Sequence, residues 1–415
     1  MSAASVSRVA ELTIDRIAAG GDGIARADSV VVFVPRSAPG DRARVRLDVR
    51  RRFARGEIEE LLSPSPQRVE PRCEHYVQDK CGGCQLQHMS YAAQLEAKQQ
   101  IIRDVLGRIG KRGVELPPIR ASEKEWRYRV KLTLALRKER GGSWIAGLHP
   151  YDDPVSVFHL RDCPITHERV VDLWREVMAA QRHFPPASEL RASVRLLDGG
   201  VSIVMEGGNS WPERGRFFQA VPAATALWWR PLHRARSLVA ERESSAASAS
   251  FAQVNPEVGE RLHQHVLARA RSYDPRSVVD AYAGSGATAI PLASDGARVV
   301  AIEWDRDASA RCAAALPDGS RAISAKVEDV LAGTLPADVV LLNPPRTGIH
   351  EQVSAALQGA ASPPRALIYV SCDPATLARD LSRMPRYRVV GLEAFDMFPQ
   401  TAHVETVCEL VPEAA

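Results

Sequence analysis

The sequence predicts a doubly wound α/β domain in its C-terminal part, behind a small OB-like β-barrel and a central α+β region. From residue 251 onward, apolar strand-like runs alternate with helical stretches, which is the pattern of parallel βαβ units. Residues 8–62 contain short strands separated by Gly and Pro turns, which is typical of a small closed barrel. A chain of 415 residues accommodates about two or three domains, and we place three at 1–66, 67–250 and 251–415.

Composition and charge narrow the class of protein. The formal net charge of +4 is mild and does not by itself require a nucleic acid partner. No apolar run approaches the roughly 20 residues that span a bilayer, and residues 1–5 do not begin a secretory signal. The seven cysteines are an odd number, so a disulfide framework is not expected. We therefore expect a cytoplasmic protein that does not associate with a membrane. We also expect it to be a monomer.

The barrel region carries a row of arginines on one predicted face. A strand is expected at Val30–Val34, and strict alternation predicts another from Arg42 to Leu47. Because every second side chain of a strand points the same way, one face of the second strand carries Arg42, Arg44 and Arg46. Between residues 41 and 55, seven Arg and two Asp give a local charge of +5. A solvated surface explains this pattern, but on an OB-like barrel it favours contact with RNA or DNA phosphates.

The central region begins after a linker rich in proline. Apolar spacing predicts a helix at residues 91–109, which we expect to pack on the C-terminal domain. Residues 126–131, Trp-Arg-Tyr-Arg-Val-Lys, interleave aromatic and cationic side chains. This segment is interpreted either as a stacking and phosphate surface or as an alternating edge strand.

Four cysteines of this region form a candidate ligand set. Cys73, Cys81 and Cys84 are spaced C-x7-C-x2-C, and Cys163 follows far downstream, directly before a proline. The glycines at 82 and 83 let the chain bend around a bound group. Four thiolates suit Zn²⁺ or an iron–sulfur cluster. Three close cysteines and a distant one followed by proline favour the cluster.

A glycine-containing turn predicts a nucleotide-like cofactor. Residues 280–287, Asp-Ala-Tyr-Ala-Gly-Ser-Gly-Ala, lie between a predicted strand and a predicted helix, where glycines allow a close approach to a ligand. Glu303 closes the next strand and suits a ribose diol. These features fit NAD or S-adenosylmethionine. The acidic Asp280 and the presence of Ala289 in place of a third glycine favour S-adenosylmethionine.

Three further polar positions are predicted at the same sheet edge. Asn343 ends a strand before Pro344-Pro345-Arg346, where its amide can bond a substrate base or the cofactor. Cys372 follows the apolar strand 366–370 and is interpreted as a nucleophile or as an inert packed thiol. Glu405 lies in a predicted strand and is interpreted as a catalytic base or as an edge residue.

Taken together, these residues resemble the RNA uracil-C5 methyltransferases, in particular the iron–sulfur branch that methylates 23S ribosomal RNA. The most specific match is residues 371–380, Ser-Cys-Asp-Pro-Ala-Thr-Leu-Ala-Arg-Asp, which implies Cys372 as the nucleophile. Residues 396–401 run into His403-Val404-Glu405 and imply Glu405 as the base. The resemblance covers almost the whole chain. It implies a Rossmann-like methyltransferase domain, a TRAM domain for the barrel, and a 4Fe-4S cluster on the four cysteines.

The resemblance also implies contacts to S-adenosylmethionine. The segment 251–255 resembles the start of the family's catalytic domain and implies a contact from Gln253, while Glu303 is implied to bind the ribose. The remaining implied cofactor residues are Tyr282, Gly284, Ala287 and Asn343. The chain departs from the family at Asn343, commonly Asp, at Ala287, Asn in some members, and in the first cysteine spacing, seven rather than five.

The implied reaction converts a uridine of RNA to 5-methyluridine. A thiolate adds to C6 of uracil, C5 becomes enolate-like and takes the methyl group, and a base then removes the C5 proton. The uridine has to leave its stack to react. Transfer RNA is the nearest alternative substrate to ribosomal RNA. Adenine-N6 methylation would suit residues 343–345 but not Arg346, where an aromatic is usual, and a non-catalytic RNA-binding protein would leave Cys372 and Glu405 without a role.

Overall fold

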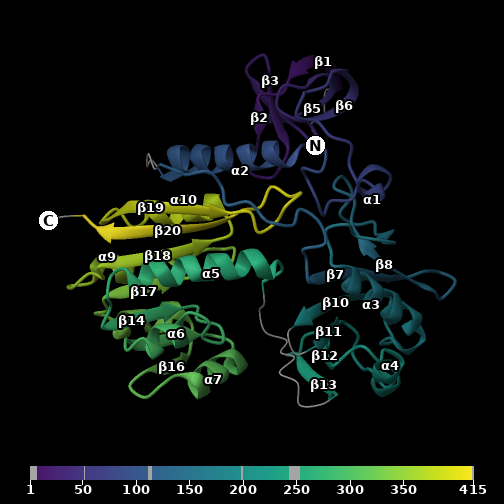
Figure 1. The fold of residues 1–415 in the computed structure, drawn as a ribbon. Helices are drawn as coiled ribbons and strands as arrows, with labels where there is room; N and C mark the ends of the chain where they lie inside the picture. The colour runs from purple at the N-terminus through teal and green to yellow at the C-terminus, as the bar shows by residue number, and fades with distance from the viewer. Residues whose placement is uncertain (1–6, 51, 111–114, 198–199, 243–252, 414–415) are drawn as a thin grey trace, which may run out of the picture.

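The structure, a computed structural model, describes residues 7–50, 52–110, 115–197, 200–242 and 253–413. They form a six-stranded and two seven-stranded sheets, which meet around a central junction of loops (Figure 1). We call them the barrel sheet, the central sheet and the C-terminal sheet, in chain order. Within the described residues, no helix has both the length and the apolar character needed to cross a membrane.

The barrel sheet has the strand order β1-β5-β6-β4-β3-β2. Its interior is apolar and includes Val32, Val45 and Leu47, all fully buried. The strands predicted around Val30 and Arg42 are confirmed. The strand bounds are β1 (Ser7–Thr13), β2 (Arg16–Ile17), β3 (Gly23–Ala27), β4 (Val30–Val34), β5 (Arg42–Val49) and β6 (Phe53–Ser63).

The predicted arginine face exists, but carboxylates of neighbouring strands accompany it. Arg42, Arg44 and Arg46 are exposed on β5. Glutamates from β1 and β6 lie beside them, in the pairs Arg42–Glu11, Arg44–Glu60 and Arg46–Glu57. The local charge counted along residues 41–55 therefore overstates the charge that this face presents, because strand pairing brings in acids from elsewhere in the sequence.

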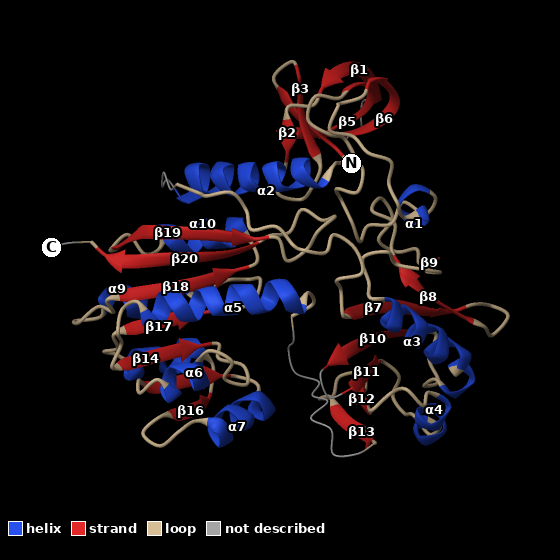
Figure 2. Cartoon of the chain, viewed as in Figure 1, coloured by secondary structure: helices blue, strands red, loops and turns tan. Residues whose placement is uncertain are grey.

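The central sheet has the order β13-β12-β11-β10-β7-β8-β9, and helices pack on one of its faces (Figure 2). That face is apolar: Leu134 and Val194 share a core with Trp174 of α3 and Phe217 of α4. The strands are β7 (Lys131–Lys138), β8 (Trp144–Leu148), β9 (Phe158–His159), β10 (Glu189–Leu197), β11 (Gly200–Glu206), β12 (Ala226–Arg230) and β13 (Ser237–Glu241). The helices are α1 (Glu74–Val77), α3 (Glu168–Ala179), the 3-10 turn η2 (Gln181–His183) and α4 (Arg214–Ala220).

Helix α2 (Tyr91–Val105) precedes the strands of the central sheet in the sequence. It nevertheless packs against the C-terminal domain. The Ser90 side chain caps its first turn by accepting from the Ala93 amide. Its apolar side, including Ile101 and Ile102, shares a core with Leu377 of α10. The π-helical turn η1 (Leu106–Gly110) continues it. The predicted helix at 91–109 is thus present, with a changed pitch in its last turn.

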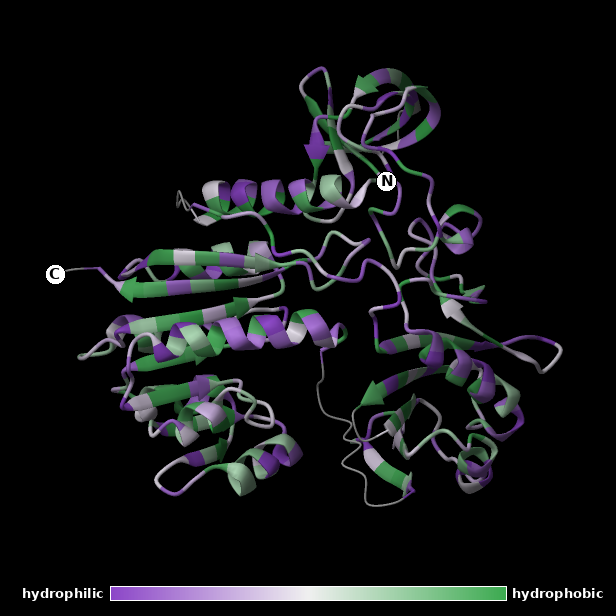
Figure 3. Cartoon of the chain, viewed as in Figure 1, coloured by the Kyte–Doolittle hydropathy of each residue, from purple (hydrophilic) through white to green (hydrophobic). Residues whose placement is uncertain are grey.

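The C-terminal sheet confirms the predicted doubly wound fold. Its order is β16-β15-β14-β17-β18-β20-β19, parallel except for β20, which runs antiparallel to both neighbours. Figure 3 shows its central strands as largely apolar. The strands are β14 (Ser277–Ala281), β15 (Arg298–Glu303), β16 (Arg321–Ser324), β17 (Val339–Leu342), β18 (Ala366–Ser371), β19 (Tyr387–Phe395) and β20 (Glu405–Pro412). The helices are α5 (Pro256–Arg271), α6 (Ala289–Ser294), α7 (Arg306–Ala315), α8 (Val327–Val330), the 3-10 turn η3 (Leu331–Thr334), α9 (Glu351–Gly359) and α10 (Pro374–Ser382).

A buried ion pair joins α2 to the turn between β19 and β20. Lys98 Nζ lies 2.6 Å from Asp396 Oδ1, and both side chains are fully buried. Lys98 also donates to the Phe398 carbonyl at 3.1 Å. Burial lowers the pKa of Lys98, and Asp396 opposes that shift. Since an unpaired charge is costly inside a protein, each partner requires the other.

We predict that Lys98→Met lowers the free energy of unfolding by about 3–5 kcal/mol, because it leaves the Asp396 carboxylate buried without its partner. The double variant Lys98→Met/Asp396→Leu should lose less than the single variant. Urea unfolding followed by circular dichroism measures both. The matched control is Lys124→Met, which removes an exposed pair with Glu257 and should cost below about 1 kcal/mol. Equal losses for the two single variants would contradict the prediction.

Candidate active site

The predicted site residues gather at one edge of the C-terminal sheet. The strand order reverses at β14, which lies between β15 and β17. Ligands of such sheets bind beyond the carboxyl ends of the strands at this reversal. The glycine turn follows β14, Glu303 ends β15, Asn343 follows β17 and Cys372 follows β18. The sheet therefore presents these four features along a single edge.

Strand pairing brings Cys372 and Glu405 together. β18 and β20 are antiparallel, and Ser371 lies opposite Thr406. The Thr406 hydroxyl donates to the Ser371 carbonyl at 3.0 Å, which fixes this register. Cys372 directly follows Ser371, and Glu405 directly precedes Thr406. Continuing the register by one residue therefore sets Cys372 opposite Glu405. The thiol and the carboxyl thus come from opposite positions of two neighbouring chain segments.

Burial and nearby charges shift the pKa of both groups. Burial raises the pKa of the Cys372 thiol, and the adjacent Glu405 raises it further. Burial raises the pKa of Glu405 to about 8. Arg346, in the loop after β17, opposes both shifts. A carboxyl with so high a pKa is a stronger proton acceptor than an ordinary glutamate.

The backbone around Cys372 is fixed by its neighbours. The Asp373 amide donates to Ser371 Oγ at 3.3 Å, and Asp373 caps α10 by accepting from the Thr376 amide at 2.8 Å. The Thr376 hydroxyl donates to the Arg346 carbonyl at 3.1 Å. The thiol is therefore held between the end of β18 and the start of α10, with the loop of Arg346 tied to the same helix.

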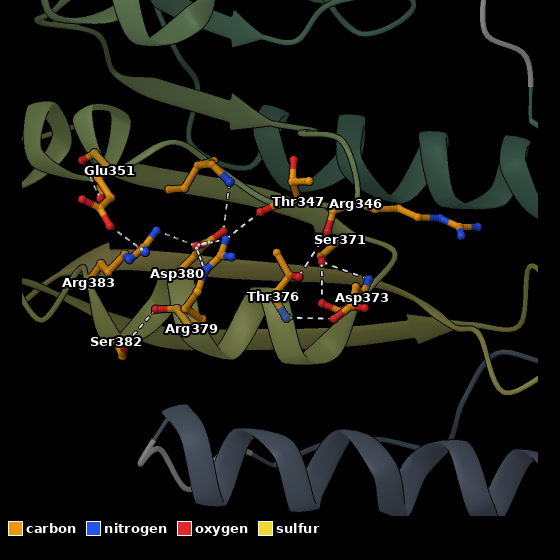
Figure 4. A network of polar contacts seen from close by, with 12 residues as sticks. Arg346, Thr347, Glu351, Ser371, Asp373, Thr376, Arg379, Asp380, Ser382 and Arg383 are labelled. Carbon is orange, nitrogen blue, oxygen red and sulfur yellow. Dashed lines mark hydrogen bonds and ion pairs between the residues drawn. The ribbon is translucent and has the colours of Figure 1, made fainter. Parts of the chain in front are cut away.

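Asp380 is the centre of a buried polar network beneath this loop (Figure 4). Its fully buried carboxylate accepts from Tyr369 Oη at 2.8 Å and from the Ile349 amide at 3.0 Å. Arg379 pairs with it at 2.7 Å. Gly348 has a φ of +77°, and a Cβ there would lie 2.3 Å from Asp380 Oδ2. The loop after β17 can therefore take this path only with glycine at that position.

The turn that leads into Glu405 is also held from several sides. Gln94 of α2 and Gln400 exchange two bonds: Gln94 Nε2 donates to Gln400 Oε1, and the Gln400 amide donates to Gln94 Oε1, both at 2.9 Å. The amides of Gln85 and Leu86 donate to the Gln400 carbonyl. Tyr128 donates to the Pro399 carbonyl at 3.0 Å. The turn before Glu405 is thus held by helix α2, by the cysteine segment (residues 73–86) and by Tyr128 of the central region.

The glycine turn has the backbone geometry of a ligand cradle. Tyr282, Gly284 and Gly286 all have positive φ, of 68°, 57° and 92°. A Cβ added at Gly284 would meet no atom within 4 Å, so space is open there. Glu303 accepts from the Gly284 amide at 2.9 Å, which places its carboxylate beside the turn. The turn and this carboxylate fit a ligand with a ribose, as the sequence predicts.

Three further predicted cofactor residues lie in two places, the cavity of Cys372 and the glycine turn. Asn343 and Gln253 line the same cavity as Cys372. Ala287 lies on the glycine turn with an exposed side chain, and its carbonyl accepts from His263 of α5 at 2.8 Å. Asp280 is buried beneath the turn and accepts from the Thr288 hydroxyl. Burial raises the pKa of Asp280 to about 7.

The four predicted ligand cysteines line this cavity, as do Cys372 and Glu405. Burial raises the pKa of all four thiols, to about 12 for Cys81. The Gly83 amide donates to Cys81 Sγ at 3.4 Å. Among the residues that the structure describes, however, no three His, Cys, Asp or Glu side chains form a ready metal site.

The cavity has a volume of about 570 Å³ and extends from the cysteine segment to the C-terminal sheet's edge. Its walls include cationic side chains from the central sheet, among them Lys131 and Arg191. The sequence did not single out Arg191, nor Lys98 and Asp380 as positioning residues. Only Asp380 carried a signal, since it ends the matched segment 371–380.

Comparisons with known protein families identify two parts of the chain. Residues 4–58 match the TRAM domain. Residues 317–411, which contain both Cys372 and Glu405, match the tRNA (Uracil-5-)-methyltransferase family. The crystal structure of Pyrococcus abyssi tRNA (uracil-54, C5)-methyltransferase in complex with S-adenosyl-L-homocysteine is similar with a TM-score of 0.70. The match covers 97% of this chain and 100% of that chain at 23% identity, so it supports the fold.

Curated relatives are similar over nearly their full length. An uncharacterized RNA methyltransferase of Thermosynechococcus vestitus is 34% identical over 96% of this chain and 97% of its own. An uncharacterized RNA methyltransferase of Synechocystis sp. is 32% identical over 98% of this chain and 96% of its own. The chain therefore belongs to the S-adenosylmethionine-dependent RNA (uracil-5-)methyltransferases that carry an N-terminal TRAM domain.

Proposed function

We propose that this enzyme converts a uridine of 23S ribosomal RNA to 5-methyluridine through a covalent bond between Cys372 and C6 of the base. The observation that carries the mechanism is the antiparallel register that sets Cys372 opposite Glu405 at the open edge of the sheet. The choice of ribosomal RNA follows from the four-cysteine segment and its resemblance to the iron–sulfur branch of the family. The protein would act in a reducing compartment, the cytoplasm.

The residues of the chain divide the reaction between them. The Cys372 thiolate forms a bond to C6, which moves an electron pair toward C5 and the C4 carbonyl. S-adenosylmethionine, when bound, would supply its electrophilic methyl group to C5 and would leave as S-adenosylhomocysteine, whose sulfur keeps the electron pair of the broken S–CH3 bond. Glu405 then accepts the C5 proton, and the electron pair of that C–H bond restores the C5–C6 double bond and expels the thiolate. Both side chains act in their deprotonated forms, and no net proton is left on Cys372.

The cofactor would be held by residues of the sheet edge. We assign Glu303 to the ribose hydroxyls, because its carboxylate already lies beside the glycine turn. Gln253 and Asn343 line the cavity that contains Cys372 and would contact the cofactor near the reacting groups. The turn itself would contribute Tyr282, Gly284 and Ala287.

A 4Fe-4S cluster on Cys73, Cys81, Cys84 and Cys163 is part of the proposal. Four cysteines in one pocket, of which three are buried and Cys163 is half-buried, suit a sulfur-ligated group. We assign the cluster a structural role: it would join the segment of Cys163 to the segment 73–84, whose following residues bind the Gln400 carbonyl.

Transfer RNA is the second candidate substrate. The structural similarity to a transfer RNA methyltransferase favours it, as does the description of the family matched by residues 317–411. Mapping 5-methyluridine by mass spectrometry in both RNA classes from a deletion strain separates the two. We expect loss of the modification at a 23S site and its return with the wild-type gene. Loss in transfer RNA alone would replace the substrate that we propose.

We predict that Glu405→Gln accumulates a covalent protein–RNA adduct, because an amide cannot take the C5 proton that must leave before the thiol. Ribosomal RNA from the deletion strain and S-adenosylmethionine are the substrates. A band resistant to sodium dodecyl sulfate, and a Cys372 peptide carrying 5-methyluridine in mass spectrometry, report the adduct. Cys372→Ala and the double variant Cys372→Ala/Glu405→Gln should form no covalent adduct. Both should still bind RNA. Normal turnover by Cys372→Ala would refute the mechanism.

We predict that anaerobically purified protein is brown and contains about four irons per chain, as a 4Fe-4S cluster requires. Cys163→Ala should lose the visible absorbance and lower the melting temperature. Cys312→Ala is the matched control, since Cys312 is buried on α7 away from the cysteine segment and should keep the absorbance. Colourless protein with one zinc per chain would contradict the cluster, and unchanged stability and RNA affinity after cluster loss would contradict its structural role.

A further inference from the structure

The wall of the cavity opposite the sheet edge is cationic. Lys131 of β7 and Arg191 of β10 line the cavity that also contains Cys372 and Glu405. In the central sheet, β10 pairs with β7, and Arg195 lies directly opposite Lys131. These side chains stand on the face opposite to the apolar one that α3 covers, because they alternate with Leu132 and its neighbours. The cationic face is therefore turned toward the active site.

Three acids of the central region are paired with cations other than Lys131 and Arg191. Glu189 lies 2.6 Å from Arg137, Glu206 lies 3.2 Å from Arg230 and Asp162 lies 2.8 Å from Arg127. Within the part of the chain that the structure describes, the side chains of Lys131 and Arg191 form no ion pair or hydrogen bond with the protein. Their charges thus remain available to a ligand.

The electrostatics of Lys131 show how concentrated this charge is. Burial lowers the pKa of its ammonium to about 8, and repulsion from Arg195, Arg129 and Arg191 contributes to the shift. The barrel arginines differ, since glutamates accompany them. A cluster of like charges beside a cavity is costly to the free protein and becomes favourable when an anion binds.

We propose that Lys131 and Arg191 bind phosphate oxygens of the RNA backbone that flank the uridine entering the cavity. This inference rests on the proposed function and identifies two substrate-positioning residues for it. A base that reaches Cys372 has left its stack, so its flanking phosphates lie at the cavity wall. The guanidinium fork of Arg191 and the compact ammonium of Lys131 both suit phosphate oxygens.

The test measures RNA binding by full-length protein against salt concentration. The probe is a fluorescein-labelled oligouridylate of about 12 nucleotides, within the usual range of single-strand site sizes. For Lys131→Gln and Arg191→Gln, we expect Kd to rise about five- to tenfold each. The slope of log K against log salt should fall by about 0.7 for each lost phosphate contact and by about 1.4 in the double variant.

The matched control is Lys138→Gln, at the exposed far end of the same strand, which should keep the wild-type slope. In turnover, the double variant should show a raised KM for RNA, with kcat at saturating RNA and KM for S-adenosylmethionine unchanged. A wild-type slope in the double variant, or an equal loss in Lys138→Gln, would overturn the inference. If no 5-methyluridine forms but the slope still falls, the proposed function fails and the phosphate site stands.

Discussion

The buried ion pair between Lys98 and Asp396 is the constraint on which the active site depends. An ammonium without its carboxylate is strongly disfavoured inside a protein, so the turn after β19 has one acceptable position against α2. That position fixes the start of β20 and, with it, the residue opposite Cys372. The geometry of the site therefore depends on helix α2, which lies about three hundred residues earlier in the chain.

The same turn receives contacts from the other parts of the molecule. The cysteine segment binds the Gln400 carbonyl, and Arg36 of the barrel region in turn donates to the Tyr76 and Cys81 carbonyls of that segment. Arg36 also stacks over the Tyr76 ring at 3.9 Å. A continuous series of contacts thus runs from the barrel through the cysteine segment to the turn before Glu405. Through this series of contacts, the cluster that we propose on the cysteines would support the turn before Glu405 without a redox step.

Local patterns in the sequence predicted the strands and the glycine turn and singled out the candidate site residues, because apolar periodicity and turn residues act over short distances. These local patterns do not predict which distant strands pair with each other. The position of β20 beside β18 sets Glu405 opposite Cys372. This position is known only from the strand order of the folded sheet. The glutamates beside Arg42 and its neighbours came from β1 and β6 for the same reason. The common cavity of the cysteines and Cys372 likewise depends on how the cysteine segment, the central sheet and the C-terminal sheet meet.

The distribution of charge bears on how the enzyme selects its base. Extracting a base from its stack costs a few kcal/mol, and contacts made only after extraction offset that cost where they lie next to the cavity. Arginines that already have carboxylate neighbours, as on the barrel, gain less from a phosphate because an existing pair must be exchanged. Cations without such partners beside Cys372 gain the full interaction. RNA binding is therefore expected to be loose along the barrel and tight at the cavity, which favours an RNA whose target uridine is already unpaired.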